Sequence, residues 1–91
     1  ARAPVAKPSK NGFTGTLIVL VDSRSASAAE MFARIAQIEK RGTVIGDRTA
    51  GAGHMVQGYP LVDGFVAGVS ITRVSDPRTG REWEAIGVQP D

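Results

Sequence analysis

The sequence predicts an α/β domain that consists of a strand–helix–strand (βαβ) unit followed by one or more β-hairpins. Two observations predict it. A segment with helical periodicity lies between two short runs of branched apolar residues, and a Gly-rich stretch then leads into alternating apolar and polar residues around an Asp-Gly pair. Short joints between strand, helix and strand require a parallel pair with a right-handed crossover. With 91 residues, the chain is one domain at most.

The two strands of the βαβ unit are expected over residues 16–22 and 43–46. The first is a continuous run of branched apolar residues bounded by Gly15 and by the Asp22-Ser23 pair. Such a run is typical of a strand that is buried on both faces. The second strand follows the helix directly, and we expect it to be buried as well.

The helix between them is expected over residues 27–40. Its apolar residues recur at helical spacing and predict the buried stripe, which consists of Ala28, Met31, Phe32, Ile35 and Ile38. The opposite polar face is expected to carry Glu30, Arg34, Gln37 and Arg41. Glu30 and Arg34 stand four apart in the order that favours an ion pair. Serines suit the N-terminus of this helix, and Gly42 suits its C-cap.

A β-hairpin is expected in the second half of the chain. Residues 47–58 contain three glycines and are predicted to form a loop. Residues 59–62 and 65–74 are the predicted arms, joined by the turn pair Asp63-Gly64. Residues 75–80 read as a polar turn, and the tail, residues 83–91, has too little periodicity to assign.

Residues 1–12 differ in composition from the rest of the chain. Residues 1–12 hold two prolines, three basic side chains and no apolar period, which predicts a linker or arm. Residues 13–91 are the predicted folded part. The chain does not begin with Met, and we expect it to be a piece of a longer protein. Its sequence therefore does not predict the cellular compartment of that protein.

Composition excludes several classes of function. The net charge of +2 is too small, and the basic residues too scattered, to predict a nucleic-acid partner. The longest apolar run is far below the roughly 20 residues that cross a bilayer, so no membrane insertion by this segment is expected. With no cysteine and one histidine, we expect no metal site, and no glycine motif for a nucleotide cofactor is present.

The densest chemical signal is a cluster of serines where the first strand meets the helix. Ser23, Ser25 and Ser27 lie there, close to the small residues Ala26, Ala28 and Ala29. A serine at a helix N-terminus faces unpaired backbone N–H groups, which can stabilise the oxyanion formed when the hydroxyl attacks a carbonyl. The alternative is that these serines are ordinary N-caps. The residues alone do not decide between the two or among the three serines.

Four segments in order resemble the tail-specific (C-terminal processing) serine peptidase family, which includes the tricorn core and the interphotoreceptor retinoid-binding proteins. They are Val19-Leu20-Val21-Asp22, Ser25-Ala26-Ser27-Ala28-Ala29-Glu30, Val44-Ile45-Gly46-Asp47-Arg48-Thr49-Ala50-Gly51 and Trp83-Glu84-Ala85-Ile86-Gly87-Val88-Gln89-Pro90-Asp91. The resemblance implies that residues 13–91 are the C-terminal part of the catalytic domain, with a Clp-protease/crotonase-like fold. It also implies a peptide or protein substrate, no cofactor, and packing against the missing N-terminal part of the domain. By resemblance alone, the longer protein is periplasmic or secreted.

The resemblance also assigns roles. Ser27, three residues before the glutamate, is the implied nucleophile, and the N–H of Ala28 is one implied oxyanion donor. The processing branch has a lysine base where this chain has Ala52, and alanine cannot accept a proton. The loop is closer to the tricorn and retinoid-binding branch, in which a histidine from an earlier segment is the base. Glu84 matches the glutamate that orients that histidine; otherwise it is a surface carboxylate.

Three further expectations follow. His54, the only histidine, invites a pairing with Ser27, but the resemblance favours a loop or substrate-pocket role for it. The isolated chain is expected to be inactive because its base is missing, and to self-associate through apolar surface that the missing part would cover. The alternatives for the longer protein are a non-catalytic ligand- or protein-binding domain of the same fold, and acyl-CoA chemistry at a similar helix N-terminus.

Overall fold

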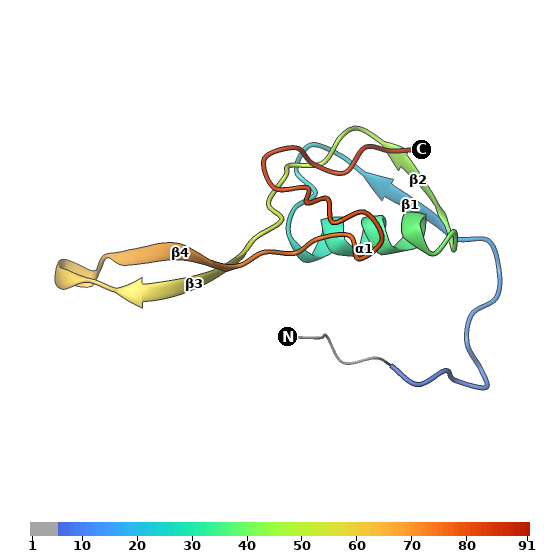
Figure 1. The fold of residues 1–91 in the computed structure, drawn as a ribbon, viewed down its shortest axis with the longest axis horizontal. Coiled ribbons are helices and arrows are strands. Elements are labelled where there is room, and N and C mark those ends of the chain that lie inside the picture. The colour runs from blue at the N-terminus through green and yellow to red at the C-terminus, as the bar shows by residue number, and fades with distance from the viewer. Residues whose placement is uncertain (1–5) are drawn as a thin grey trace.

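The computed structural model describes residues 6–91 and contains the predicted strand–helix–strand unit (Figure 1). Strand β1 (Ile18–Val21) leads into helix α1 (Ala28–Ile38), which leads into strand β2 (Thr43–Gly46). β1 and β2 are parallel, with Ile18 opposite Thr43 and Val21 opposite Gly46. The predicted parallel pair is confirmed, and β2 has the predicted bounds. β1 and α1 are each shorter than predicted at both ends.

The second half of the chain forms the predicted hairpin, which projects away from the βαβ unit (Figure 1). Strand β3 (Met55–Pro60) is antiparallel to strand β4 (Val66–Thr72), and the short 3-10 helix η1 (Val62–Gly64) joins them. Asp63 and Gly64 have φ angles of 57° and 76°, the left-handed conformations that a tight hairpin turn requires. The predicted turn pair is therefore confirmed.

The predicted start of the hairpin, at residue 59, was wrong. β3 begins at Met55, so residues 55–58 belong to the strand and not to the loop. Gly58 was interpreted as a loop residue, but it lies opposite Gly68 of β4. This cross-strand pairing is not visible in the local sequence. The second arm ends at Thr72, two residues earlier than predicted.

The small core combines the βαβ unit with the C-terminal tail. Its buried residues are Val21, Ala33, Val44, Trp83 and Val88. The tail, which had no predicted structure, contributes two of them. It is also hydrogen-bonded to β2, because Asp91 N–H donates to Val44 O (2.9 Å) and Val44 N–H donates to the Asp91 carboxylate (2.7 Å). The tail therefore closes the core beside β2.

The buried face of α1 is not the predicted one. The buried residues of the helix are Glu30, Ala33 and Ala36, whereas Phe32 is 57% exposed and Ile35 52% exposed. Small side chains let the helix approach the two strands closely, and the larger apolar stripe faces outward. Both strands are likewise buried on one face only, since Leu20 of β1 is 78% exposed and Ile45 of β2 is 47% exposed. Of the predicted stripe, Ala28, Phe32 and Ile35 are exposed, whereas Met31 is half-buried and packs against the core.

Two local predictions about α1 were also wrong. The helix does not end at Gly42: Lys40, with φ 50°, follows the C-cap, and the N–H groups of Lys40 and Arg41 donate to Gln37 O and Ala36 O in a Schellman arrangement. The expected Glu30–Arg34 pair is absent as well. Arg34 instead donates to the Asp76 carboxylate (2.9 Å), which fastens the predicted polar turn to the helix.

The N-terminal segment carries no regular structure where it is described. Residues 6–12 are exposed and contain neither helix nor strand, and the rest of the predicted arm, residues 1–5, lies outside the described residues. Within residues 6–91, no helix is long and apolar enough to pass through a bilayer.

Candidate active site

Ser27 stands at the N-cap of α1, with an exposed side chain. Its backbone has φ 57° and ψ −119°, a left-handed φ that a non-glycine residue rarely adopts. The other two serines differ. The Ser25 hydroxyl accepts a hydrogen bond from Asp22 N–H (3.0 Å) and so belongs to the turn after β1, and Ser23 lies earlier in that turn. Of the three, Ser27 alone meets the helix.

The backbone amides at the start of α1 are not equivalent. Ser27 N–H donates to the Glu30 carboxylate (2.9 Å), and Ala29 N–H donates to Ala26 O (3.2 Å). No hydrogen bond within residues 6–91 uses the N–H of Ala28. The free donor beside the Ser27 hydroxyl is therefore the amide of the next residue, at the positive end of the helix.

Glu30 is completely buried and holds this region together. One carboxylate oxygen accepts from Thr49 Oγ1 (2.5 Å) and Gly51 N–H (2.7 Å), and the other from Ser27 N–H (2.9 Å) and Ala52 N–H (2.8 Å). Burial raises the pKa of Glu30, but these four hydrogen bonds outweigh it and hold the pKa below its ordinary value. The carboxylate is thus ionised and its four acceptor positions are filled.

Glu84 holds the next part of the same loop. The N–H groups of Gly53 and His54 both donate to one oxygen of the half-buried Glu84 carboxylate, at 2.6 and 2.7 Å. The amides of residues 51–54 are therefore divided between two carboxylates: Glu30 takes the first two and Glu84 the last two. This loop links the start of α1 to the C-terminal tail.

His54 is engaged away from Ser27. Its Nε2 lies 3.0 Å from the Glu82 carboxylate, and Arg73 Nε lies 3.7 Å from the other oxygen of Glu82. Within residues 6–91, no hydrogen bond joins Ser27 to either His54 or Glu84. The structure thus joins Glu84 to the backbone of His54, and it joins neither of them to Ser27 by a hydrogen bond within the described residues.

Residues that the sequence reasoning missed are central to this geometry. Helical spacing predicts Glu30 on the solvent-facing side of the helix, and no sequence pattern predicts a role for Thr49. The spacing Ser27-x-x-Glu30 is that of a capping box and could have indicated that the carboxylate turns back toward the helix start. No comparable local signal marks Thr49, which is buried by segments distant in sequence.

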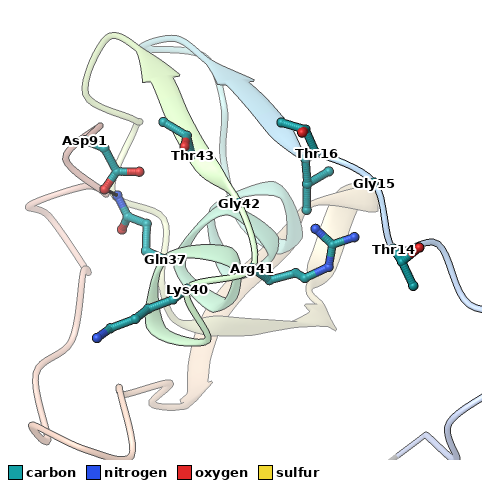
Figure 2. A pocket seen from close by; sticks show the side chains of 10 residues that line it. Thr14, Gly15, Thr16, Gln37, Lys40, Arg41, Gly42, Thr43 and Asp91 are labelled. Atoms are coloured by element: carbon teal, nitrogen blue, oxygen red, sulfur yellow. Dashed lines mark hydrogen bonds between the residues drawn. The ribbon is translucent and has the colours of Figure 1, made fainter.

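One further site in the described part of the chain is distinct from this one. A polar pocket of about 500 Å³ lies at the opposite end of α1, where Arg41 points toward Thr14 and Gly15, ahead of β1, and Lys40 points away from them (Figure 2). It contains none of the predicted site residues. Nowhere in residues 6–91 do three His, Cys, Asp or Glu side chains gather as a metal site would require.

The model of peptidase family S41 matches residues 2–91. The chain belongs to peptidase family S41. A chloroplastic C-terminal processing peptidase of Tetradesmus obliquus is 39% identical over 75 residues, which cover 82% of this chain and 16% of that protein. A chloroplastic carboxyl-terminal-processing peptidase 1 of Arabidopsis thaliana is 32% identical over the whole chain and 18% of its own length.

Two solved structures agree with this S41 assignment. A photosystem II D1 C-terminal processing protease has a TM-score of 0.69 at 38% identity, covering 84% of this chain and 19% of its own. Mature CPAF complexed with lactacystin has a TM-score of 0.75 at 27% identity, covering 91% and 16%. The predicted mixed α/β fold and the predicted family are confirmed. The S41 segment described here spans less than a fifth of the length of these relatives.

Proposed function

We propose that this segment carries the nucleophile of a serine-type peptidase, and that the nucleophile is Ser27. The observation that carries the proposal is an exposed hydroxyl at a left-handed N-cap position, next to the uncommitted N–H of Ala28. Membership of peptidase family S41 supports a peptide or protein substrate. A preorganised amide of this kind contributes roughly 3–4 kcal/mol to a transition state that develops an oxyanion.

The proposed reaction proceeds through an acyl-enzyme. Ser27 Oγ bonds to the carbonyl carbon of the scissile peptide, the Oγ proton passes to a base, and the C–N bond breaks as that proton is delivered to the leaving amine. Water then hydrolyses the ester and restores the hydroxyl. The base, and a second oxyanion donor, come from a part of the longer protein that precedes this segment.

Glu84 is proposed to orient that base. One of its carboxylate oxygens accepts two loop amides, and no hydrogen bond within residues 6–91 uses the other oxygen. A fixed carboxylate with one open oxygen suits a partner for an imidazole N–H. His54 is proposed to serve the loop and not the chemistry, because its ring is paired with Glu82.

The proposed setting for this site is the C-terminal part of a Clp-protease/crotonase-like catalytic core, formed by residues 13–91. The βαβ unit presents Ser27 where the chain leaves β1 and enters α1. The exposed apolar side chains of α1 and β1 support packing against the rest of the domain.

A fluorophosphonate probe tests the proposal on the full-length protein. We expect covalent labelling at Ser27, with loss of labelling in Ser27→Ala and retention in Ser23→Ala, the matched variant in the turn before it. The isolated 91-residue chain is expected to show no peptidase activity. Hydrolysis by the isolated chain that depends on Ser27 would assign the base to His54 instead.

A second function is favoured by one observation. Ala52 occupies the position at which the processing branch of the tail-specific peptidases carries its lysine base, so this segment supplies no lysine base there. A non-catalytic binding domain of the same fold would show this substitution as well. Full-length protein that resists the probe while remaining folded would support the binding domain over the peptidase.

A further inference from the structure

A continuous hydrogen-bonded path runs from the C-terminal tail to the backbone of Ser27. Val88 N–H donates to Thr49 Oγ1 (2.7 Å), and the same hydroxyl donates its single proton to the Glu30 carboxylate (2.5 Å). Glu30 in turn accepts Ser27 N–H (2.9 Å). Thr49 is only 5% exposed, and its own N–H donates to Val88 O (3.2 Å).

We propose that Thr49 is a positioning residue for the Ser27 nucleophile, acting through Glu30. This inference rests on the proposed function of Ser27. Within residues 6–91, the Thr49 hydroxyl is hydrogen-bonded to Glu30 and Val88 and not to Ser27, so its effect on Ser27 is indirect. Its hydroxyl fixes which way the Glu30 carboxylate is turned, and the carboxylate fixes the Ser27 amide.

The consequence for catalysis follows from the two neighbouring amides. Because Glu30 takes the N–H of Ser27, that group is withheld from the oxyanion, and the N–H of Ala28 is left as the donor. A carboxylate that rotates would release the Ser27 amide and relax its φ of 57°. The Ser27 hydroxyl and the Ala28 amide would then no longer keep their relative placement, on which oxyanion stabilisation depends.

The Thr49 hydroxyl accepts one hydrogen bond and donates another, so variants can be chosen that either remove both or keep both. Thr49→Val keeps the size and branching of the side chain but can neither accept from Val88 N–H nor donate to Glu30. Thr49→Ser keeps both hydrogen bonds and loses only a methyl group. Thr16→Val is the matched control, because Thr16 is exposed and makes no side-chain hydrogen bond within residues 6–91.

The experiment measures fluorophosphonate labelling of the full-length protein as a function of probe concentration, which separates the maximal labelling rate from the half-saturating concentration. We expect Thr49→Val to lower the maximal rate roughly 10- to 100-fold with the half-saturating concentration unchanged, the size expected for a displacement near 1 Å. Thr49→Ser and Thr16→Val should stay within about twofold of the wild type. Thermal unfolding is recorded for each variant.

The outcomes separate the two proposals. Wild-type protein that is not labelled at all refutes the proposed function of Ser27, and the positioning role with it. Labelled wild type with an unchanged maximal rate in Thr49→Val overturns the positioning role alone. An equal loss in Thr49→Ser overturns it as well, because that variant keeps the hydroxyl and both of its hydrogen bonds. Should Thr49→Val fail to fold, Thr49→Ala against Thr49→Ser decides by the same criterion.

Discussion

Replacing Glu30 by Gln tests how much the buried carboxylate contributes to this segment. Four donors, three backbone N–H groups and one hydroxyl, converge on it. A Gln amide offers one accepting oxygen with two lone pairs, and its NH₂ group would face the other two donors. Each buried donor left unpaired costs about 1–3 kcal/mol, so Glu30→Gln should destabilise the region by roughly 2–6 kcal/mol. That is a large part of the roughly 5–15 kcal/mol that stabilises a typical domain.

Hydrogen exchange on the full-length protein measures this directly, through the opening free energy of the Gly51 and Ala52 amides. The matched control is Glu39→Gln, next to the end of the same helix, where the side chain is 61% exposed and pairs with Arg78. An exposed pair of this kind contributes at most about 1 kcal/mol. Equal protection of the two amides in both variants would refute the structural role assigned to Glu30.

The pH dependence of the same comparison has a defined sign. The folded-state pKa of Glu30 lies below its ordinary value of 4.5. A lowered carboxyl pKa contributes stability that is present above the unfolded-state value and lost as the pH falls through the folded-state value. The gap between wild type and Glu30→Gln should therefore be full at about pH 7 and shrink below pH 4.5. A gap that widens on acidification would contradict the ionised state.

Two further predictions concern backbone geometry and exposed surface. Gly87 has φ 81°, and a Cβ there would lie 2.3 Å from Thr49 O, so Gly87→Ala should destabilise the full-length protein by well over the roughly 1–2 kcal/mol that a left-handed alanine costs. The control is Gly80→Ala, because Gly80 has φ 69° and no atom lies within 4 Å of its added Cβ. Equal melting temperatures of the two variants would contradict the clash. The isolated chain should self-associate through exposed apolar side chains that include Leu20 and Phe32, which are 78% and 57% exposed. Leu20→Lys should weaken this association. A monomer peak in size-exclusion chromatography at every concentration would count against it.

The elements of this segment were largely predictable because local signals mark them. Branched apolar runs gave both strands of the βαβ unit, and the Asp63-Gly64 pair gave the hairpin turn that the structure contains. The faces were not predictable. Periodicity assumes that the larger apolar residues of a helix are buried, whereas Ala33 and Ala36 are the ones that meet the strands here. The large side chains face a side that this segment does not fill.

The candidate site was predictable in position but not in its supports. Ser27 was expected at the helix start and lies there, exposed, with α1 beginning at the next residue. The assignment of Glu30 to the polar face failed because three of its four hydrogen-bond partners come from residues 49–52, which lie about twenty positions further along the chain. Helical spacing describes one element at a time. The capping-box spacing of Ser27 and Glu30 marks only the contact at the helix start, and the contacts to the distant loop have no local signal.

The division of the four loop amides between Glu30 and Glu84 has a consequence for ligands. Glycine-rich stretches beside helix ends commonly bind phosphates or other anions through their free N–H groups. In residues 51–54 those groups already face the protein's own negative charges. An incoming anion would meet repulsion at this loop and no free N–H group, so these four amides do not form an anion site.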